Sequence, residues 1–237
     1  MSTISATDAI GEATSALVGA FDLTDVLARL MISCADVLEA DAAGLVVRTS
    51  SGNLELLAAS SHRATELEIY QVQQDDGPCV DCIHLGDQVS SVGSGEIDAR
   101  WPGLHGAIGK AGFEMVHAVP LNWRAETLGG LNIFRARTEK LSQHEVILAK
   151  TFADVATLAL LQAPELTPGE VSARMVDAMR GRVVIEQAKG ALSHAWGSNM
   201  EQAYQGLLRF ARAEGLTLTA AADRVLNDAV NGSLMPM

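Results

Sequence analysis

The sequence predicts an α+β protein with two domains: an N-terminal antiparallel sheet flanked by helices, and a C-terminal three-helix bundle. Three observations lead to this prediction. Residues 22–161 mix helical periodicity with short strand-like runs, residues 169–230 carry only helical periodicity, and a segment with two prolines separates them. Because 48% of the 237 residues are hydrophobic, both parts have enough apolar side chains to form a core.

Amphipathic helices are expected near both ends of the N-terminal part. Residues 22–39 place apolar side chains at helical spacing behind Asp22, a residue type that caps helices. Residues 142–161 begin with Ser142 and Glu145 in the spacing of a capping box. The second half of that helix is apolar on most sides. We therefore expect the sheet to bury one side of it and a second copy of the chain to bury the other.

Short runs between these helices have the composition of strands. Residues 44–49 and 54–59 flank a turn-forming Ser-Ser-Gly-Asn segment, which predicts a hairpin with antiparallel strands. Further strands are expected at residues 88–92, 114–121 and 128–134.

The segment 162–168 contains two of the six prolines and marks the domain boundary. A proline restricts the residue before it to extended conformations. Residues 167–170 (TPGE) then combine a capping threonine, a proline suited to the first helical position and a capping-box acid. With the boundary near residue 165, the predicted domains are 1–164 and 165–237.

Three helices are expected after the boundary, at residues 169–195, 200–214 and 217–230. Each carries apolar residues at positions i, i+3, i+4 and i+7. Gly197 and Gly215 stand where the first two helices should end. Three short helices with one apolar stripe each predict a small bundle.

Net charge differs between the two parts of the chain. The whole chain carries −12; residues 1–170 hold 10 Lys and Arg against 23 Asp and Glu, and residues 171–237 hold seven against six. An acidic chain disfavours nucleic-acid binding, because binding depends on basic groups that replace counterions. The nearly neutral C-terminal part permits RNA binding without predicting it.

The sequence contains no run of about 18 apolar residues, so we expect no membrane span. The first residues lack the basic start and the apolar stretch of a secretory signal. We therefore expect a cytoplasmic protein whose cysteines, Cys34, Cys79 and Cys82, stay mostly reduced.

The C-terminal sequence resembles an ANTAR domain over about residues 170–231. The resemblance is carried by residues 182–192 (RVVIEQAKGAL), 201–204 (EQAY), 207–209 (LLR) and 218–225 (LTAAADRV). It implies a module that binds RNA hairpins and acts in transcription antitermination. The sequence departs from the family pattern after Gly190, where alanine takes the place of a basic residue.

The N-terminal sequence resembles a GAF domain of the kind fused to ANTAR modules, over about residues 20–162. The resemblance is carried by residues 76–82 (DGPCVDC), 100–102 (RWP), 119–121 (VPL) and 128–133 (LGGLNI). It implies a sensor domain of the small-molecule-binding type, with an unidentified ligand.

Candidate RNA contacts are basic and polar residues on the three C-terminal helices. RNA hairpins are recognised through their phosphates and through exposed loop bases. Helical spacing places Arg182 and Lys189 on one stripe of the first helix, and Arg209 and Arg212 on one stripe of the second. Thr219 lies away from the apolar stripe of the third helix. Because one module offers little basic surface, we expect a homodimer that grips two hairpins.

Structural interpretations of the same residues remain open. A charged stripe on a helix is often only solvated surface. Lys189 is also suited to packing within the bundle, with its aliphatic stem over Tyr204 or Trp196. Trp196 invites a base-stacking interpretation, but its place beside a helix-ending glycine favours an anchor of the bundle core.

Candidate lining residues of a sensor pocket are Cys79, Trp101 and His117. In the alternative interpretation, side chains fill the pocket and the domain serves only for dimerisation. The start of a helix at Gly77 and Pro78 is expected to lower the thiol pKa of Cys79, as a redox role would require. The alternative interpretation, that Cys79 and Cys82 pack near the pocket wall, is preferred. Zinc prefers four ligands, often in two pairs, and the sequence offers one cysteine pair; no metal and no cofactor are expected.

No Walker-type phosphate loop, His-Glu-x-x-His or Gly-x-Ser-x-Gly motif occurs in the sequence, so we do not expect an enzyme. The alternative hypothesis is a GAF-based redox or small-molecule enzyme or sensor, for example one that reduces methionine sulfoxide, with the bundle as a protein-interaction module. Cyclic-nucleotide sensing is disfavoured, because its Asn-Lys-Phe-Asp-Glu signature has no evident counterpart.

Overall fold

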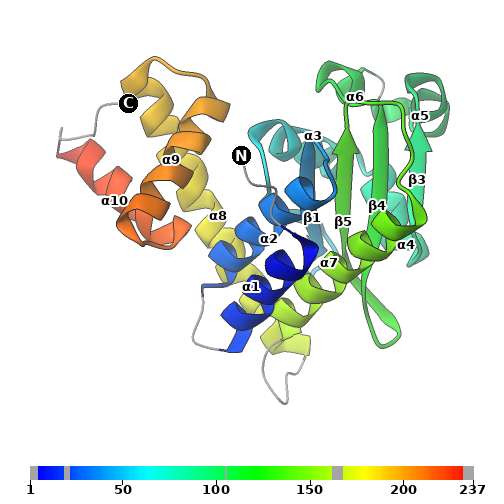
Figure 1. The fold of residues 1–237 in the computed structure, drawn as a ribbon, viewed down its shortest axis with the longest axis horizontal. Coiled ribbons are helices and arrows are strands. Elements are labelled where there is room, and N and C mark those ends of the chain that lie inside the picture. Colours follow the sequence, from blue (N-terminus) through cyan, green and yellow to red (C-terminus); the bar gives the residue numbers. More distant parts are fainter. Residues whose placement is uncertain (1–4, 19–21, 105, 162–167, 232–237) are drawn as a thin grey trace.

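The computed structural model describes residues 5–18, 22–104, 106–161 and 168–231. Five strands form one antiparallel sheet in the order β2-β1-β5-β4-β3, with helices on both faces (Figure 1). The α+β class predicted from the sequence is confirmed. The strands are β1 (Ala42–Arg48), β2 (Leu54–Ala59), β3 (Val89–Val92), β4 (Met115–Trp123) and β5 (Glu126–Arg135).

Two helical layers enclose the sheet. One layer consists of α1 (Ala6–Val18), α2 (Leu23–Val37) and α7 (Gln143–Leu161). The opposite layer consists of α3 (His62–Gln74), α4 (Pro78–Leu85), α5 (Ser94–Arg100), a 3-10 helix (Pro102–Leu104) and α6 (Ala107–Lys110).

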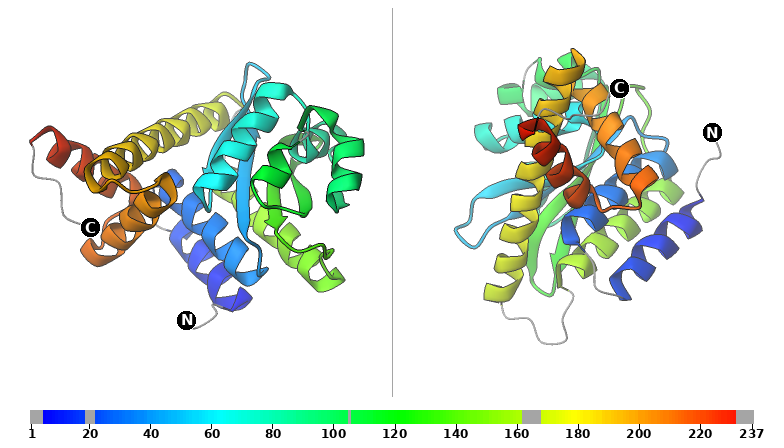
Figure 2. Two further views of the ribbon diagram at one scale, coloured as in Figure 1. Left: turned by 90° about the horizontal axis from the view of Figure 1, so that it is seen from above. Right: turned by 90° about the vertical axis from the view of Figure 1, so that its left-hand side faces the viewer.

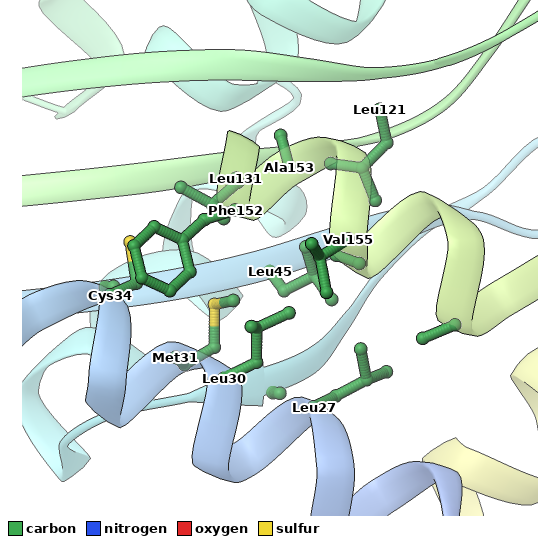
Figure 3. Close-up of a cluster of buried hydrophobic side chains, with 14 of the residues drawn as sticks. Leu27, Leu30, Met31, Cys34, Leu45, Leu121, Leu131, Phe152, Ala153 and Val155 are labelled. Carbon is green, nitrogen blue, oxygen red and sulfur yellow. The ribbon is translucent and has the colours of Figure 1, made fainter. Parts of the chain in front are cut away.

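Apolar side chains of α2 and α7 meet those of the sheet in the largest core cluster. Figure 3 shows Leu30 and Met31 of α2 pointing toward the sheet residue Leu45 and Phe152 of α7. Cys34 is fully buried in this cluster, as its position on the apolar stripe predicts. The packing joins two helices that lie more than a hundred residues apart in the chain.

The capping residues expected from the sequence are in place. The Asp22 side chain accepts a hydrogen bond from the Asp25 backbone N at the start of α2. At the start of α7, Ser142 N donates to Glu145 Oε2 (2.7 Å) and Glu145 N donates to Ser142 Oγ (3.3 Å), which completes a capping box. Each cap satisfies backbone N–H groups that a helix leaves without an internal partner.

Three helices form the C-terminal bundle: α8 (Pro168–Trp196), α9 (Met200–Glu214) and α10 (Leu218–Val230). Their apolar stripes meet in a cluster of their own. Gly197 and Gly215 follow α8 and α9 with φ values of 61° and 63°, the left-handed conformation that glycine adopts without strain. The boundary near residue 165 and the cap at Thr167 fall outside the described residues.

The bundle packs beside the sheet domain and next to α2 (Figure 2). Met175 and Ala178 of α8 are buried in the core cluster that α2 and α7 form on the sheet. In the other direction, Ala28 of α2 is buried in the core of the bundle. Each domain therefore contributes apolar side chains to the core of the other. No helix in the described part of the chain is long and apolar enough to cross a membrane.

The Gly129–Gly130 pair in β5 permits two close approaches. A Cβ at Gly129 would lie 2.2 Å from the carbonyl oxygen of Val46 in β1. A Cβ at Gly130 would lie 3.3 Å from Cys79 Sγ on α4. Gly129 therefore allows the central strands to approach, and Gly130 allows α4 to lie on the sheet.

We expect Gly129→Ala to lower the free energy of unfolding by about 2–3 kcal/mol, because the new Cβ would clash with a backbone atom that cannot move aside alone. Chemical denaturation of the full chain measures the change. Gly11→Ala in α1 is the control: its Cβ would enter open space, and alanine is favoured over glycine in a helix by up to about 1 kcal/mol. Equal stability of Gly129→Ala and the wild type would contradict the packing described.

Candidate RNA-binding surface and buried carboxyl cluster

The outer face of α9 presents two of the candidate arginines. Arg209 and Arg212 are exposed, and Gln202 and Gln205 are exposed at neighbouring helical positions. Neither arginine forms an ion pair with a described residue. Guanidinium groups bind phosphates, and amides form hydrogen bonds with base edges. This face therefore has the chemical groups that an RNA loop requires.

Lys189 lies in the bundle rather than on its surface, with a side chain only 1% exposed. Its Nζ donates to both carboxylate oxygens of Glu186 (2.8 and 2.9 Å) and lies 4.9 Å from the centre of the Tyr204 ring. On its other side, Nζ is 3.4 Å from Nδ1 of His62 on α3. This agrees with the packed interpretation of Lys189, and it places the residue at the contact between the domains.

Arg182 and Thr219 also face the N-terminal domain. Arg182 is half-buried and lines a cavity of about 20 Å³ between α8 and the N-terminal domain. Its Nε has no hydrogen-bond partner among the described residues. Thr219 lines a cleft together with Asp22 and Thr24 at the start of α2. The five candidate residues therefore lie on two faces: one exposed, and one turned toward α2 and α3.

Trp196 packs against the bundle core at the end of α8. A Cβ at Gly206 of α9 would lie 2.4 Å from the Trp196 ring, so the ring fills the space over that glycine. This arrangement agrees with a core anchor rather than a base-stacking platform.

A fully buried polar cluster lies between the sheet and helices α3 and α4. Asn132 of β5 donates through Nδ2 to both carboxyl oxygens of Glu68 (2.7 and 2.8 Å). Gln71 Nε2 also donates to Glu68 Oε2 (3.0 Å), while Gln71 Oε1 accepts from the backbone N of Cys79 (3.2 Å). Gly44 leaves room for the carboxyl group, because a Cβ there would lie 2.5 Å from Glu68 Oε1.

Burial raises the pKa of Glu68 from 4.5 to about 8, although the hydrogen bond from Asn132 lowers it in part. The raised pKa therefore favours the protonated form of Glu68 at neutral pH. The sequence analysis did not identify Glu68, Gln71 or Asn132. The spacing of polar residues along a helix or strand does not show that they are buried or that they contact one another.

The cysteine pair does not have the properties expected of a reactive thiol. Burial raises the pKa of Cys79 well above its usual value, and it raises that of Cys82 to about 12. The expected lowering at the start of α4 is thus outweighed by the loss of solvation. Within the described residues, no group of three or more His, Cys, Asp or Glu side chains is arranged to hold a metal ion.

The three candidate pocket residues do not meet. Cys79 and Trp101 lie on the α4 side of the sheet, where Trp101 Nε1 donates to Asp81 of α4 (2.9 Å). His117 pairs with Ile133 in the strand register and points to the opposite face, toward α7. Burial, together with the charge of Arg135, lowers the pKa of His117 to about 4, so its ring is neutral at pH 7.

An antiparallel sheet between two helical layers is followed by a three-helix bundle with exposed arginines on α9. Family comparison makes the chain a regulatory protein with a sensor domain and an output domain of the RNA-binding type. The GAF domain model matches residues 22–160, and the ANTAR domain model matches residues 173–226. The chain belongs to the GAF domain family and carries an ANTAR domain after it.

Solved GAF domains share the fold. The GAF domain of a phosphoenolpyruvate-protein phosphotransferase from Acinetobacter has 13% identity and a TM-score of 0.52, over 73% of this chain and 93% of that one. The corresponding domain from Coxiella burnetii has 16% identity and a TM-score of 0.52, over 67% and 94%. A phycoerythrobilin-bound GAF domain from a cyanobacterial phytochrome has 12% identity and a TM-score of 0.51, over 68% of this chain and 97% of that one. No curated protein matches the chain.

The buried carboxyl of Glu68 predicts a pH-dependent stability. Its folded pKa of about 8 exceeds the usual 4.5, so the folded state binds the proton more tightly than the unfolded state. The stability from this group is complete below about pH 4.5, falls as the pH rises toward 8, and then levels off. Between pH 5 and pH 8 we expect the wild type to lose about 3 kcal/mol through this group.

Glu68→Gln should remove this loss, because the amide does not titrate. Urea unfolding at pH 5, 6, 7 and 8 measures the difference in slope between variant and wild type. Glu66→Gln is the matched control on the same helix, since the Glu66 side chain is 70% exposed, and it should keep the wild-type slope. If Glu68→Gln also keeps that slope, Glu68 is ionised in the folded protein.

Proposed function

We propose that this protein is a transcription antitermination regulator whose ANTAR module binds RNA hairpins under the control of the GAF domain. The observation that carries the proposal is the outer face of α9, where Arg209 and Arg212 are exposed without an ion-pair partner in the described chain. The match of residues 173–226 to the ANTAR domain supports RNA as the ligand of this face. The proposal includes recognition of RNA hairpins, a role in antitermination and a cytoplasmic site of action.

A homodimer is part of the proposal. Ile147 and Leu158 of α7 are 58% and 56% exposed, at positions where a second copy of the chain would cover them. Two modules held by one dimer would bind adjacent hairpins with the gain in affinity that a shared tether provides. In this arrangement the GAF domain sets the distance between the modules and remains the place for a small-molecule signal.

The redox alternative has weaker support. A reactive cysteine needs a thiolate near neutral pH, whereas burial raises the thiol pKa of both Cys79 and Cys82. The alternative also leaves the ANTAR module without a role.

The RNA proposal is tested by titrating the full chain with an RNA that carries two adjacent short hairpins, at several salt concentrations. We expect Arg209→Gln and Arg212→Gln each to weaken binding about tenfold and to reduce the slope of log K against log salt by about one, because each removes a phosphate contact. Arg124→Gln removes the same charge from the β4–β5 turn and should leave binding unchanged. Equal binding by all three variants would contradict the assigned face, and absence of binding at low salt would contradict the proposed function.

A further inference from the structure

The contact between the two domains combines apolar packing with specific hydrogen bonds. Helix α2, strand β2 and the start of α3 on the GAF side meet α8, α9 and α10 of the ANTAR module. The hydrogen bonds across this contact include Thr24 Oγ1 to Ala178 O (3.2 Å), Leu218 N to Asp25 Oδ1 (2.7 Å), Tyr204 Oη to Ala59 O (3.2 Å) and His62 N to Glu201 Oε2 (3.0 Å).

The module side of this contact has the groups of an anion-binding surface. Leu218 N is a backbone donor at the first turn of α10, and helix N-termini attract phosphates and carboxylates. Arg182 lines the same small cavity as Leu218. Lys189 lines it too, but its Nζ is already hydrogen-bonded to the Glu186 carboxylate in that cavity. The GAF domain meets this surface with the Asp25 carboxylate, which accepts the Leu218 N–H, a donor of the kind that also binds phosphate oxygens. Two of the predicted RNA contacts thus lie against the acidic half of the protein.

The contact leaves polar groups poorly satisfied. Arg182 Nε and Thr219 Oγ1 are buried without a hydrogen-bond partner among the described residues. Burial raises the pKa of Asp25, although the bond from Leu218 and the charge of Arg29 oppose this. A buried donor without a partner costs free energy that exposure to water or to a phosphate would recover. Domains of one chain move relative to one another unless their interface is large and hydrophobic. This contact combines the apolar packing of Ala28, Met175 and Ala178 with hydrogen bonds that water or a phosphate could replace.

We propose that the face of the ANTAR module now held by the GAF domain is part of its RNA-binding surface, so that GAF docking and RNA binding exclude each other. The proposal rests on the proposed function and adds its regulation: the GAF domain is an intramolecular competitor of RNA. In the docked state, RNA can reach the candidate contacts on α9 but not those at the domain contact. When the domains separate, RNA can also bind Arg182 and the start of α10.

A disulfide that holds the domains together tests this directly. A Cβ at Gly181 of α8 would lie 3.0 Å from Cβ of Thr24 on α2. Disulfide-bonded Cβ atoms lie about 3.5–4.5 Å apart, so a small shift allows the bond. In Thr24→Cys/Gly181→Cys the crowding atoms of Thr24 are replaced by the bonding sulfur. Mass spectrometry of the full chain verifies the cross-link before RNA is added.

The oxidised double variant should bind the two-hairpin RNA at least tenfold more weakly than the same protein after reduction. Thr24→Cys alone, oxidised and reduced, controls for the native thiols and should show no such difference. Equal affinity of the oxidised and reduced double variant overturns the proposal. If the reduced double variant, the wild type and a folded variant with separated domains all fail to bind, the failure lies with the proposed RNA function.

A second variant tests the opposite direction. Ala28 of α2 is 5% exposed and packs in the bundle core, so Ala28→Glu would place a carboxylate there and favour separation. It adds no positive charge that could attract RNA by itself. Provided that circular dichroism shows an unchanged helix content, we expect several-fold tighter RNA binding. Unchanged or weaker binding by the folded variant overturns the proposal.

Discussion

The relation between the two domains depends on the packing of α2 against α8. One side of α2 covers the sheet together with α7, and the other side places Ala28 in the core of the bundle. Gly181 permits the close approach, because a side chain there would meet Thr24. Asp25 then accepts the backbone N–H of Leu218 and so takes part in capping α10 from the neighbouring domain. A single helix therefore supports the sensor fold and positions the output module.

Helix α3 connects the two polar sites of the molecule. Its first residue, His62, contacts Glu201 and Lys189 of the module, while Glu68, less than two turns further on, belongs to the buried carboxyl cluster. Asn132 ties that cluster to the central strand β5. The interior of the GAF domain and the contact with the ANTAR module are thus joined by one helix of 13 residues.

The sequence predicted the helices and strands that have a clear apolar periodicity or a capping residue. It did not predict the elements whose polar residues become buried only through contacts with distant parts of the chain. The caps of α2 and α7 and the apolar stripes of α2, α9 and α10 matched the structure closely, as did the five strands. Helices α3, α5 and α6 were not expected, because they are short or carry polar residues on their buried sides, as Glu68 does in α3. Spacing placed Lys189 on a charged stripe, but a stripe cannot reveal that Tyr204 and His62 enclose the lysine. His117 points to the face of the sheet that its pairing with Ile133 determines. This pairing cannot be inferred from the sequence of one strand alone.

The central claim is that the domain contact and the RNA-binding surface share the same face of the module. Amide hydrogen exchange of the full chain, with and without saturating hairpin RNA, tests it most directly. The account predicts that RNA increases protection along α9 and decreases protection in β2 and at the starts of α2 and α3, where the GAF domain now contacts the module. If RNA protects α9 while these GAF segments keep their protection, the domains stay docked on RNA and the shared face is contradicted.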